Sequence, residues 1–263
     1  MPFTDSIGEA TINGLAYVGD LARLTGGAVA ANFTQPIWSK PLRWKRAVHQ
    51  AMAVGVEALP IVSLIAFFIG VILALQGAYE LRKLGALQLV AGLVALAVTR
   101  ELGPLMTAVM VIGRSGSSFA AEIGTMKVNE ELDALQTMAL KPVHFLVAPK
   151  FLAMVLMMPC LTVWSDFMGV LGGGLFGVTN AGFTWGTYFH ATIVALVLHD
   201  VLTGLIKSVM FGLVITAVGC QEGFSTGLGS EQVGRSTTSA VVKSIFAVIA
   251  VDLVFTALFY FAK

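Results

Sequence analysis

The chain has 263 residues, of which 57% are hydrophobic and 12% are charged, and its formal net charge is +1. Charged residues make up roughly a quarter of an ordinary soluble domain, so this composition excludes one and indicates an integral membrane protein. A net charge near zero gives no basis for nucleic-acid binding, which needs a basic face. The two cysteines, Cys160 and Cys220, lie far apart and are expected to pack as small apolar residues.

The first 50 residues are the part least suited to crossing a membrane. Residues 1–40 are weakly hydrophobic, with leucines and valines at helical spacing, which predicts a helix at the membrane surface. A basic, aromatic collar follows, which favours the cytoplasmic interface. Its members are Trp38, Lys40, Arg43, Trp44, Lys45 and Arg46. We therefore expect interfacial, elbow-like helices over 1–50 and a transmembrane domain over 51–263. No basic segment followed by an apolar one opens the chain, so no signal-peptide cleavage is expected.

The apolar runs beyond residue 50 predict an all-α integral membrane protein. About five transmembrane helices are expected, near residues 58–78, 86–111, 151–178, 201–218 and 239–261. Residues 188–198 predict a surface or re-entrant helix on the outer side, and a sixth crossing stays open. The link at 79–85 places Arg82 and Lys83 outside, against the positive-inside rule. The glycine-rich residues 219–238 predict a cytoplasmic loop.

The longest stretch between apolar runs is 99–142, which begins in the second span and ends in water. Its glycines and serines at 113–118 predict a turn. Beyond the turn, Asn129 is expected to cap a short helix of about 11 residues whose first turn holds Glu130 and Glu131. The apolar face of that helix is formed by Val128, Leu132, Leu135 and Met138. Helices that lie on lipid favour a basic polar face, so this acidic one is better suited to a basic groove of a soluble partner.

Four ionisable residues fall inside the predicted spans. They are Arg100, Glu101, Lys207 and Asp252. Each costs about 2.5–3.5 kcal/mol at the centre of a membrane helix, so such residues usually face the interior of a bundle or a wet cavity. Two interpretations stay open: an ion-pair network that fixes helix packing, or groups that line or gate a substrate path.

Other motifs narrow the function classes. In the third span Gly169, Gly173 and Gly177 recur at intervals of four, the pattern that lets membrane helices approach closely. There is no H-E-x-x-H and no Walker A loop, so neither a metal site nor an ATP site within this chain is expected. The pair His199-Asp200 is expected to be interfacial rather than catalytic.

With these residues the chain resembles the MlaE family of ABC transporter permeases, which works with Mce-domain proteins in bacterial lipid transport. The resemblance covers about residues 55–261. Its most specific part is TRELGPLMTAVMVIGRSGSSFAAEIGTMKVNEELDALQTMALKP at 99–142. Further matches are LPIVSLIAFFIGVILALQG in the first span, LIKSVMFG in the fourth, and GRSTTSAVVKS before the last.

The resemblance implies a homodimeric permease of the bacterial inner membrane that contributes to the lipid asymmetry of the outer membrane. Two copies of a separate ATPase, which bind the ATP and Mg²⁺, would dock on a cytoplasmic coupling segment of about 113–142. A periplasmic Mce-domain protein would exchange phospholipid with a site between the two permeases. The residues expected on the substrate path are Arg100, Glu101, Lys207, Asp252, Leu73, Gln76 and Tyr79. Those expected at the ATPase contact are Glu122, Met126, Glu130, Glu131, Asp133 and Leu135.

Rival functions stay open on the residues alone. An ion-coupled secondary transporter would use Glu101 and Asp252 to relay protons or sodium, although no inverted repeat is evident. An intramembrane enzyme built on His199-Asp200 lacks a convincing nucleophile. A passive scaffold for a periplasmic partner is the third alternative, and the intramembrane charges argue against it.

Overall fold

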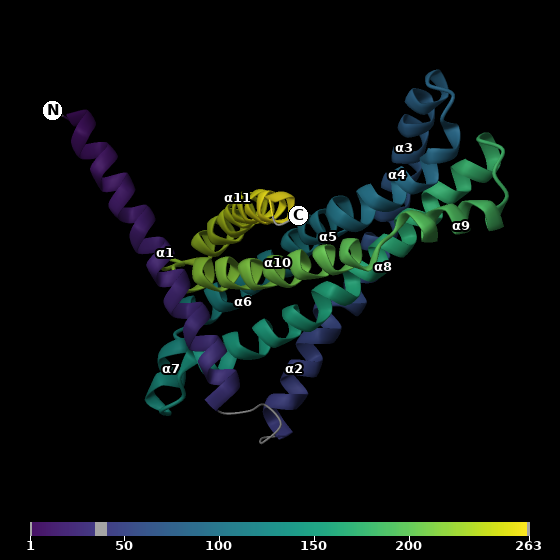
Figure 1. Ribbon diagram of the computed structural model, residues 1–263. Helices are drawn as coiled ribbons and strands as arrows, with labels where there is room; N and C mark the ends of the chain where they lie inside the picture. The colour runs from purple at the N-terminus through teal and green to yellow at the C-terminus, as the bar shows by residue number, and fades with distance from the viewer. Residues whose placement is uncertain (1, 35–40, 262–263) are drawn as a thin grey trace.

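The computed structural model describes residues 2–34 and 41–261, and every element within those ranges is helical (Figure 1). The principal helices are α1 (Pro2–Thr34), α2 (Pro41–Val54), α3 (Leu59–Lys83), α4 (Val90–Ala97), α5 (Gly103–Val111), α6 (Ser117–Val128), α7 (Glu131–Thr137), α8 (Ala148–Asn180), α9 (Trp185–Ala195), α10 (Leu198–Phe224) and α11 (Ser230–Phe261). The short α7 and α9 lie at opposite ends of the molecule. The collar residues Trp38 and Lys40 lie outside the described residues.

Five helical stretches in the described part of the chain are long and apolar enough to cross a membrane, which confirms the expected all-α membrane fold. They are Lys45–Lys83, Leu87–Val128, Val143–Asn180, Leu198–Phe224 and Ser230–Phe259. The helix α9 is separate from α10 and has 11 residues. At about 1.5 Å per residue it is too short to cross, so residues 185–224 contribute one span.

The predicted turn at 113–118 is wrong. The second span continues without a turn from α4 to α6, through π-helical turns at Val98–Leu102 and Ile112–Gly116. The Ser117 hydroxyl donates to the carbonyl of Gly113 at 2.6 Å, so it is satisfied inside the helix. Ile215 of α10 fills the space beside Gly116, and this packing offsets the weak helix propensity of glycine.

Two predicted connections are also shorter than expected. The helix α3 runs to Lys83, so the outer link reduces to a turn around Gly85, whose φ of 67° suits glycine. The predicted loop at 219–238 is mostly helix, because α10 continues to Phe224 and α11 begins at Ser230. A Cβ on Gly219 would lie 2.8 Å from the carbonyl oxygen of Gly116. This glycine therefore permits close packing of α10 on α6 and does not mark a loop.

The acidic helix also begins later than predicted. Asn129 ends α6, and Glu130 precedes α7 in the left-handed region at φ 59°, without a side-chain cap. The helix has 7 residues, not about 11. Two residues of its predicted apolar face, Leu132 and Leu135, are buried in the core of this chain. Met138 remains 62% exposed.

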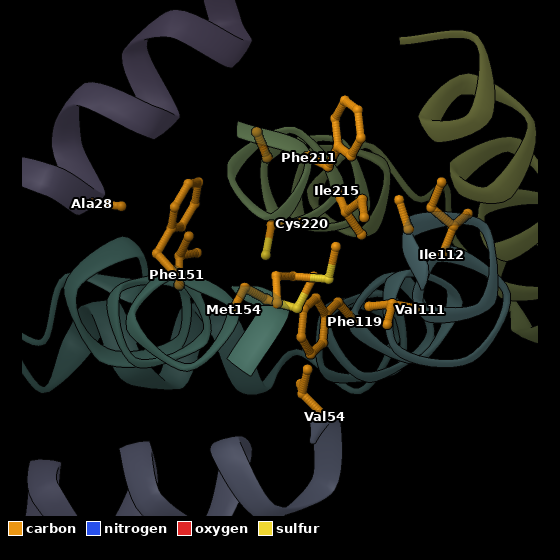
Figure 2. Packing of buried hydrophobic residues seen from close by; sticks show 14 of the residues in the cluster. Ala28, Val54, Val111, Ile112, Phe119, Phe151, Met154, Phe211, Ile215 and Cys220 are labelled. Atoms are coloured by element: carbon orange, nitrogen blue, oxygen red, sulfur yellow. The ribbon is translucent and has the colours of Figure 1, made fainter. Parts of the chain in front are cut away.

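The main core lies where α6, α8 and α10 pack together (Figure 2). Phe119, Met154 and Ile215 meet there, one from each of these helices. The surface helices add Ala28 of α1 and Val54 of α2, which are also buried. Cys220 belongs to this core as expected, whereas Cys160 is exposed on α8, and neither cysteine forms a disulfide.

The helices α3 and α8 touch at glycines. A Cβ on Gly70 would lie 1.9 Å from the carbonyl oxygen of Gly169, and one on Gly172 would lie 2.1 Å from that of Phe67. Only glycine fits at such a backbone contact. Gly173 of the predicted motif faces the Tyr188 hydroxyl of α9 and Val94 of α4, and Gly177 faces the Tyr188 ring. The glycine face of α8 thus contacts three helices.

Candidate functional site

A polar cavity of about 140 Å³ opens between the second span, α10 and α11. Its lining includes three of the four intramembrane charges named from the sequence: Arg100, Glu101 and Lys207. His199, Thr203, Thr256 and Phe259 complete the lining. The cavity therefore joins ionisable groups to an aromatic wall, within helices that are otherwise apolar.

Lys207 is the centre of the charged cluster. Its side chain is 2% exposed, and its ammonium lies 2.5 Å from Glu101 Oε2 and 2.9 Å from Asp252 Oδ1. It also donates to the Thr256 hydroxyl at 2.7 Å, and that hydroxyl in turn donates to Glu101 at 3.3 Å. Two carboxylates and a hydroxyl thus compensate one buried ammonium, as a charge in an apolar setting requires.

Arg100 points to a different partner. Its Nε donates to Asp200 Oδ1 at 2.6 Å, and the guanidinium forms an ion pair with the same carboxylate. Asp200 is 2% exposed and also accepts the backbone N–H of Val197 at 3.1 Å, which fixes the start of α10. The two residues of the expected interfacial pair His199-Asp200 therefore have different partners. Asp200 pairs with Arg100, and His199 packs edge-on against Phe259.

The backbone explains how neighbouring residues reach two clusters. Arg100 and Glu101 lie on the π-helical turn Val98–Leu102. Such single-turn bulges occur often at functional sites. Adjacent side chains of a helical turn point in different directions around its axis. Arg100 therefore reaches the start of α10 while Glu101 reaches its middle.

Leu73, Gln76 and Tyr79, also expected on the substrate path, do not line this cavity. Leu73 packs in a small cluster between α3 and α4, and Tyr79 is 64% exposed at the outer end of α3. The structure of this single chain does not bring these three residues to the charged cluster.

The expected ATPase contact is divided between two helices. Glu122 and Met126 lie on α6, and the Glu122 carboxylate pairs with the buried ammonium of Lys150 at 2.5 Å. Leu135 faces the core and not the surface. Glu130, Glu131 and Asp133 remain exposed around α7, so these three acids form the accessible acidic surface.

Sequence reasoning missed two acids within the helices: Asp166, which is partly buried, and Glu222, which is buried. Asp166 of α8 lies against Gly103, where a Cβ would meet its Oδ1 at 1.8 Å. This oxygen has no hydrogen-bond partner among the described residues. Glu222, near the inner end of α10, accepts hydrogen bonds from Ser239 and Lys243. Asp166 could have been found as a lone acid within an apolar run. Glu222 was hidden by the assignment of its surroundings to a loop.

Five helices long enough to span a membrane, three of which line a cavity with charged groups, define a multi-pass membrane protein. Residues 47–258 match the family described as Permease MlaE. A probable ABC transporter permease protein of Rickettsia bellii is 38% identical over 256 residues, which cover 97% of each chain. The chain belongs to the MlaE permease family and is a permease of an ABC transporter.

Two further relatives come from a bacterium and from a plant chloroplast. The intermembrane phospholipid transport system permease protein MlaE of Haemophilus influenzae is 37% identical over 214 residues, covering 81% of this chain and 82% of the relative. The chloroplastic protein TRIGALACTOSYLDIACYLGLYCEROL 1 of Arabidopsis thaliana is 32% identical over 232 residues, covering 88% of this chain and 66% of the relative. The resemblance inferred from the 99–142 motif is thus confirmed.

Proposed function

We propose that this permease moves phospholipids between a bacterial inner membrane and a periplasmic Mce-domain carrier, driven by a separate ATPase. The name of the Haemophilus influenzae relative supports phospholipid as the substrate. The single observation that carries the mechanism is the continuous helix from α4 to α6, which joins the charged cavity to the acidic surface of α7. A push on α7 reaches α6 through the short turn at Asn129 and Glu130, and the continuous helix passes it on to Glu101.

The working unit is a homodimer. The span formed by α11 supports this. Only 11% of the residues in its most apolar stretch are buried, against 28–56% in the other four spans. Exposed α11 side chains include Phe246, Leu253 and Leu258. A second copy would cover them and enlarge the cavity beside Lys207, so that lipid enters between the two chains. Cross-linking a Phe246→Cys variant in native membranes tests this arrangement.

The ATPase docks on the exposed acids beside α7. Motion there changes the fit of the cavity for lipid by moving Glu101 relative to Lys207. In this proposal the ATP and Mg²⁺ are bound by the ATPase. The rival secondary transporter needs Glu101 or Asp252 free to exchange ions, and both carboxylates already compensate Lys207.

Charge reversal tests the docking surface. The triple variant Glu130→Lys, Glu131→Lys and Asp133→Lys should lose the ATPase when the tagged chain is purified from native membranes and its partners are identified by mass spectrometry. The matched control is Glu231→Lys, an exposed acid in the first turn of α11. Full ATPase recovery with the triple variant would refute the docking surface. Recovery of the wild-type chain alone, with activity that follows an ion gradient, would favour the secondary transporter.

A further inference from the structure

The outer end of the molecule carries two basic residues on the side where the positive-inside rule expects few. They are Arg82 and Lys83, in the last turn of α3. Lys83 is accounted for: its ammonium lies 3.2 Å from Glu80 and 4.0 Å from the centre of the Tyr79 ring. Arg82 has no acidic partner among residues 2–34 and 41–261.

The Arg82 side chain borders a hollow of about 320 Å³ between the outer ends of α3 and α8. The two helices touch at Gly70 and Gly169, and the hollow lies beyond that contact. Its polar lining consists of Tyr79, Arg82 and Asn180, which all offer hydrogen-bond donors, and it contains no carboxylate. Its apolar lining includes Leu75, Ala78, Leu87 and Phe176.

A second, larger hollow adjoins the first. It has a volume of about 790 Å³ and shares the lining residues Leu87 and Ala181 with the smaller one. Its walls come from the turn after α3 and from α9, and they are mainly apolar, with Leu89, Val194 and Ala195 among them. None of the described residues that line it is charged. The two hollows together place a guanidinium at one end of a long apolar space.

We propose that these adjoining hollows form an outer-leaflet phospholipid site, with the phosphodiester held by Arg82 and an acyl chain lying past Leu87 toward α9. A guanidinium presents paired donors that match phosphate oxygens, and basic pockets between membrane helices bind lipid head groups. The site is separate from the charged cavity, since the lining residues of the two do not overlap. It rests on the proposed function for the choice of phospholipid as the occupant.

Photo-cross-linking of the purified full-length chain with its partner subunits tests this site. A benzophenone amino acid replaces Gln88, an exposed residue that lines the larger hollow, and the probe is labelled phosphatidylglycerol in nanodiscs. Arg82→Gln should lower cross-linking about tenfold, because it removes a charge-assisted phosphate contact. The matched control Lys83→Gln, whose ammonium is already paired, should change it less than about twofold. A benzophenone at Leu64, which is exposed elsewhere on α3, should give cross-linking that is independent of Arg82.

Other outcomes overturn the proposal. Unchanged cross-linking in Arg82→Gln, or an equal fall at Leu64, would remove the assigned site. Competition by millimolar inorganic phosphate would assign Arg82 to free phosphate. A transfer assay with labelled phospholipid separates this inference from the proposed function. Transfer by the wild-type complex with no effect of Arg82 on cross-linking would refute only the site. Arg82-dependent cross-linking without transfer would refute only the transport function.

Discussion

Two buried lysines, Lys150 and Lys207, each pair with a glutamate, but their surroundings differ. Lys150, toward the inner end, and Lys207, beside the cavity, have side chains that are 1% and 2% exposed. Each lies 2.5 Å from a glutamate that is 41% exposed. Among the described residues, Lys150 has that one acid, Glu122, and the ring of Phe119 at 4.6 Å. Lys207 has a second acid and a hydroxyl as well.

The difference lies in redundancy. A lysine with one acidic partner cannot lose it without leaving an uncompensated buried charge, so its pair holds one geometry. A lysine with two acids and a hydroxyl can exchange partners at lower cost, so its cluster can rearrange when the helices move. The first arrangement suits the base of the α7 hairpin, where Glu122 and Lys150 bracket the segment between α6 and α8. The second suits a cavity whose shape must change.

The largest expected effect follows from removing the single partner. Glu122→Gln should destabilise the chain by about 3 kcal/mol or more, because it leaves the Lys150 ammonium buried without a counter-charge. The measurement is the unfolding midpoint in detergent, followed by near-ultraviolet circular dichroism. The double variant Glu122→Gln with Lys150→Met should recover most of the loss, since apolar side chains often replace a buried pair at little cost. A Glu122→Gln variant as stable as the wild type would break the comparison.

A smaller effect on stability is expected at the cavity. Glu101→Gln leaves Lys207 with Asp252 and Thr256, so the loss of stability should be about 1 kcal/mol. Lipid transfer by the assembled complex should nevertheless fall at least about tenfold, since the cluster loses the group that moves with the second span. Equal destabilisation by Glu101→Gln and Glu122→Gln would show that the additional partners of Lys207 provide no compensation. Normal transfer by Glu101→Gln would remove this carboxylate from the mechanism.

The hydropathy pattern predicted the spans because membrane insertion depends on composition averaged over about 20 residues. The errors arose where one residue type has two physical uses. Gly219 was assigned to a loop, yet it allows α10 to approach α6, and that contact depends on a residue about 100 positions away. The charges at Arg100 and Lys207 were found from their depth in the membrane. The pairing of Arg100 with Asp200 is a tertiary contact that no local pattern specifies.

The smallest effect is expected at a buried polar group that lacks a partner. Tyr188 of α9 is fully buried against the glycine face of α8, and its hydroxyl has no hydrogen-bond partner within the part of the chain that the structure describes. Burial raises the pKa of this phenol to about 12 from its usual 10.0. Its neutral form is therefore favoured in the folded state, and this contribution to stability is complete below about pH 10 and lost as the pH rises through about 12.

Tyr188→Phe should leave the stability near neutral pH unchanged or raise it by up to about 1 kcal/mol, because no hydrogen bond is lost and a buried hydroxyl without a partner is removed. It should also reduce the fall in stability at alkaline pH, measured as the unfolding midpoint in steps from about pH 9 to 12. Tyr79→Phe, at a 64% exposed position, is the control and should leave the alkaline profile unchanged. If wild type and Tyr188→Phe fall in parallel, ionisation of this phenol does not limit stability. A large loss of stability at neutral pH would instead show that the hydroxyl has a partner in the assembled transporter. The outer end would then depend on a single polar contact, as the inner end depends on the Lys150 pair.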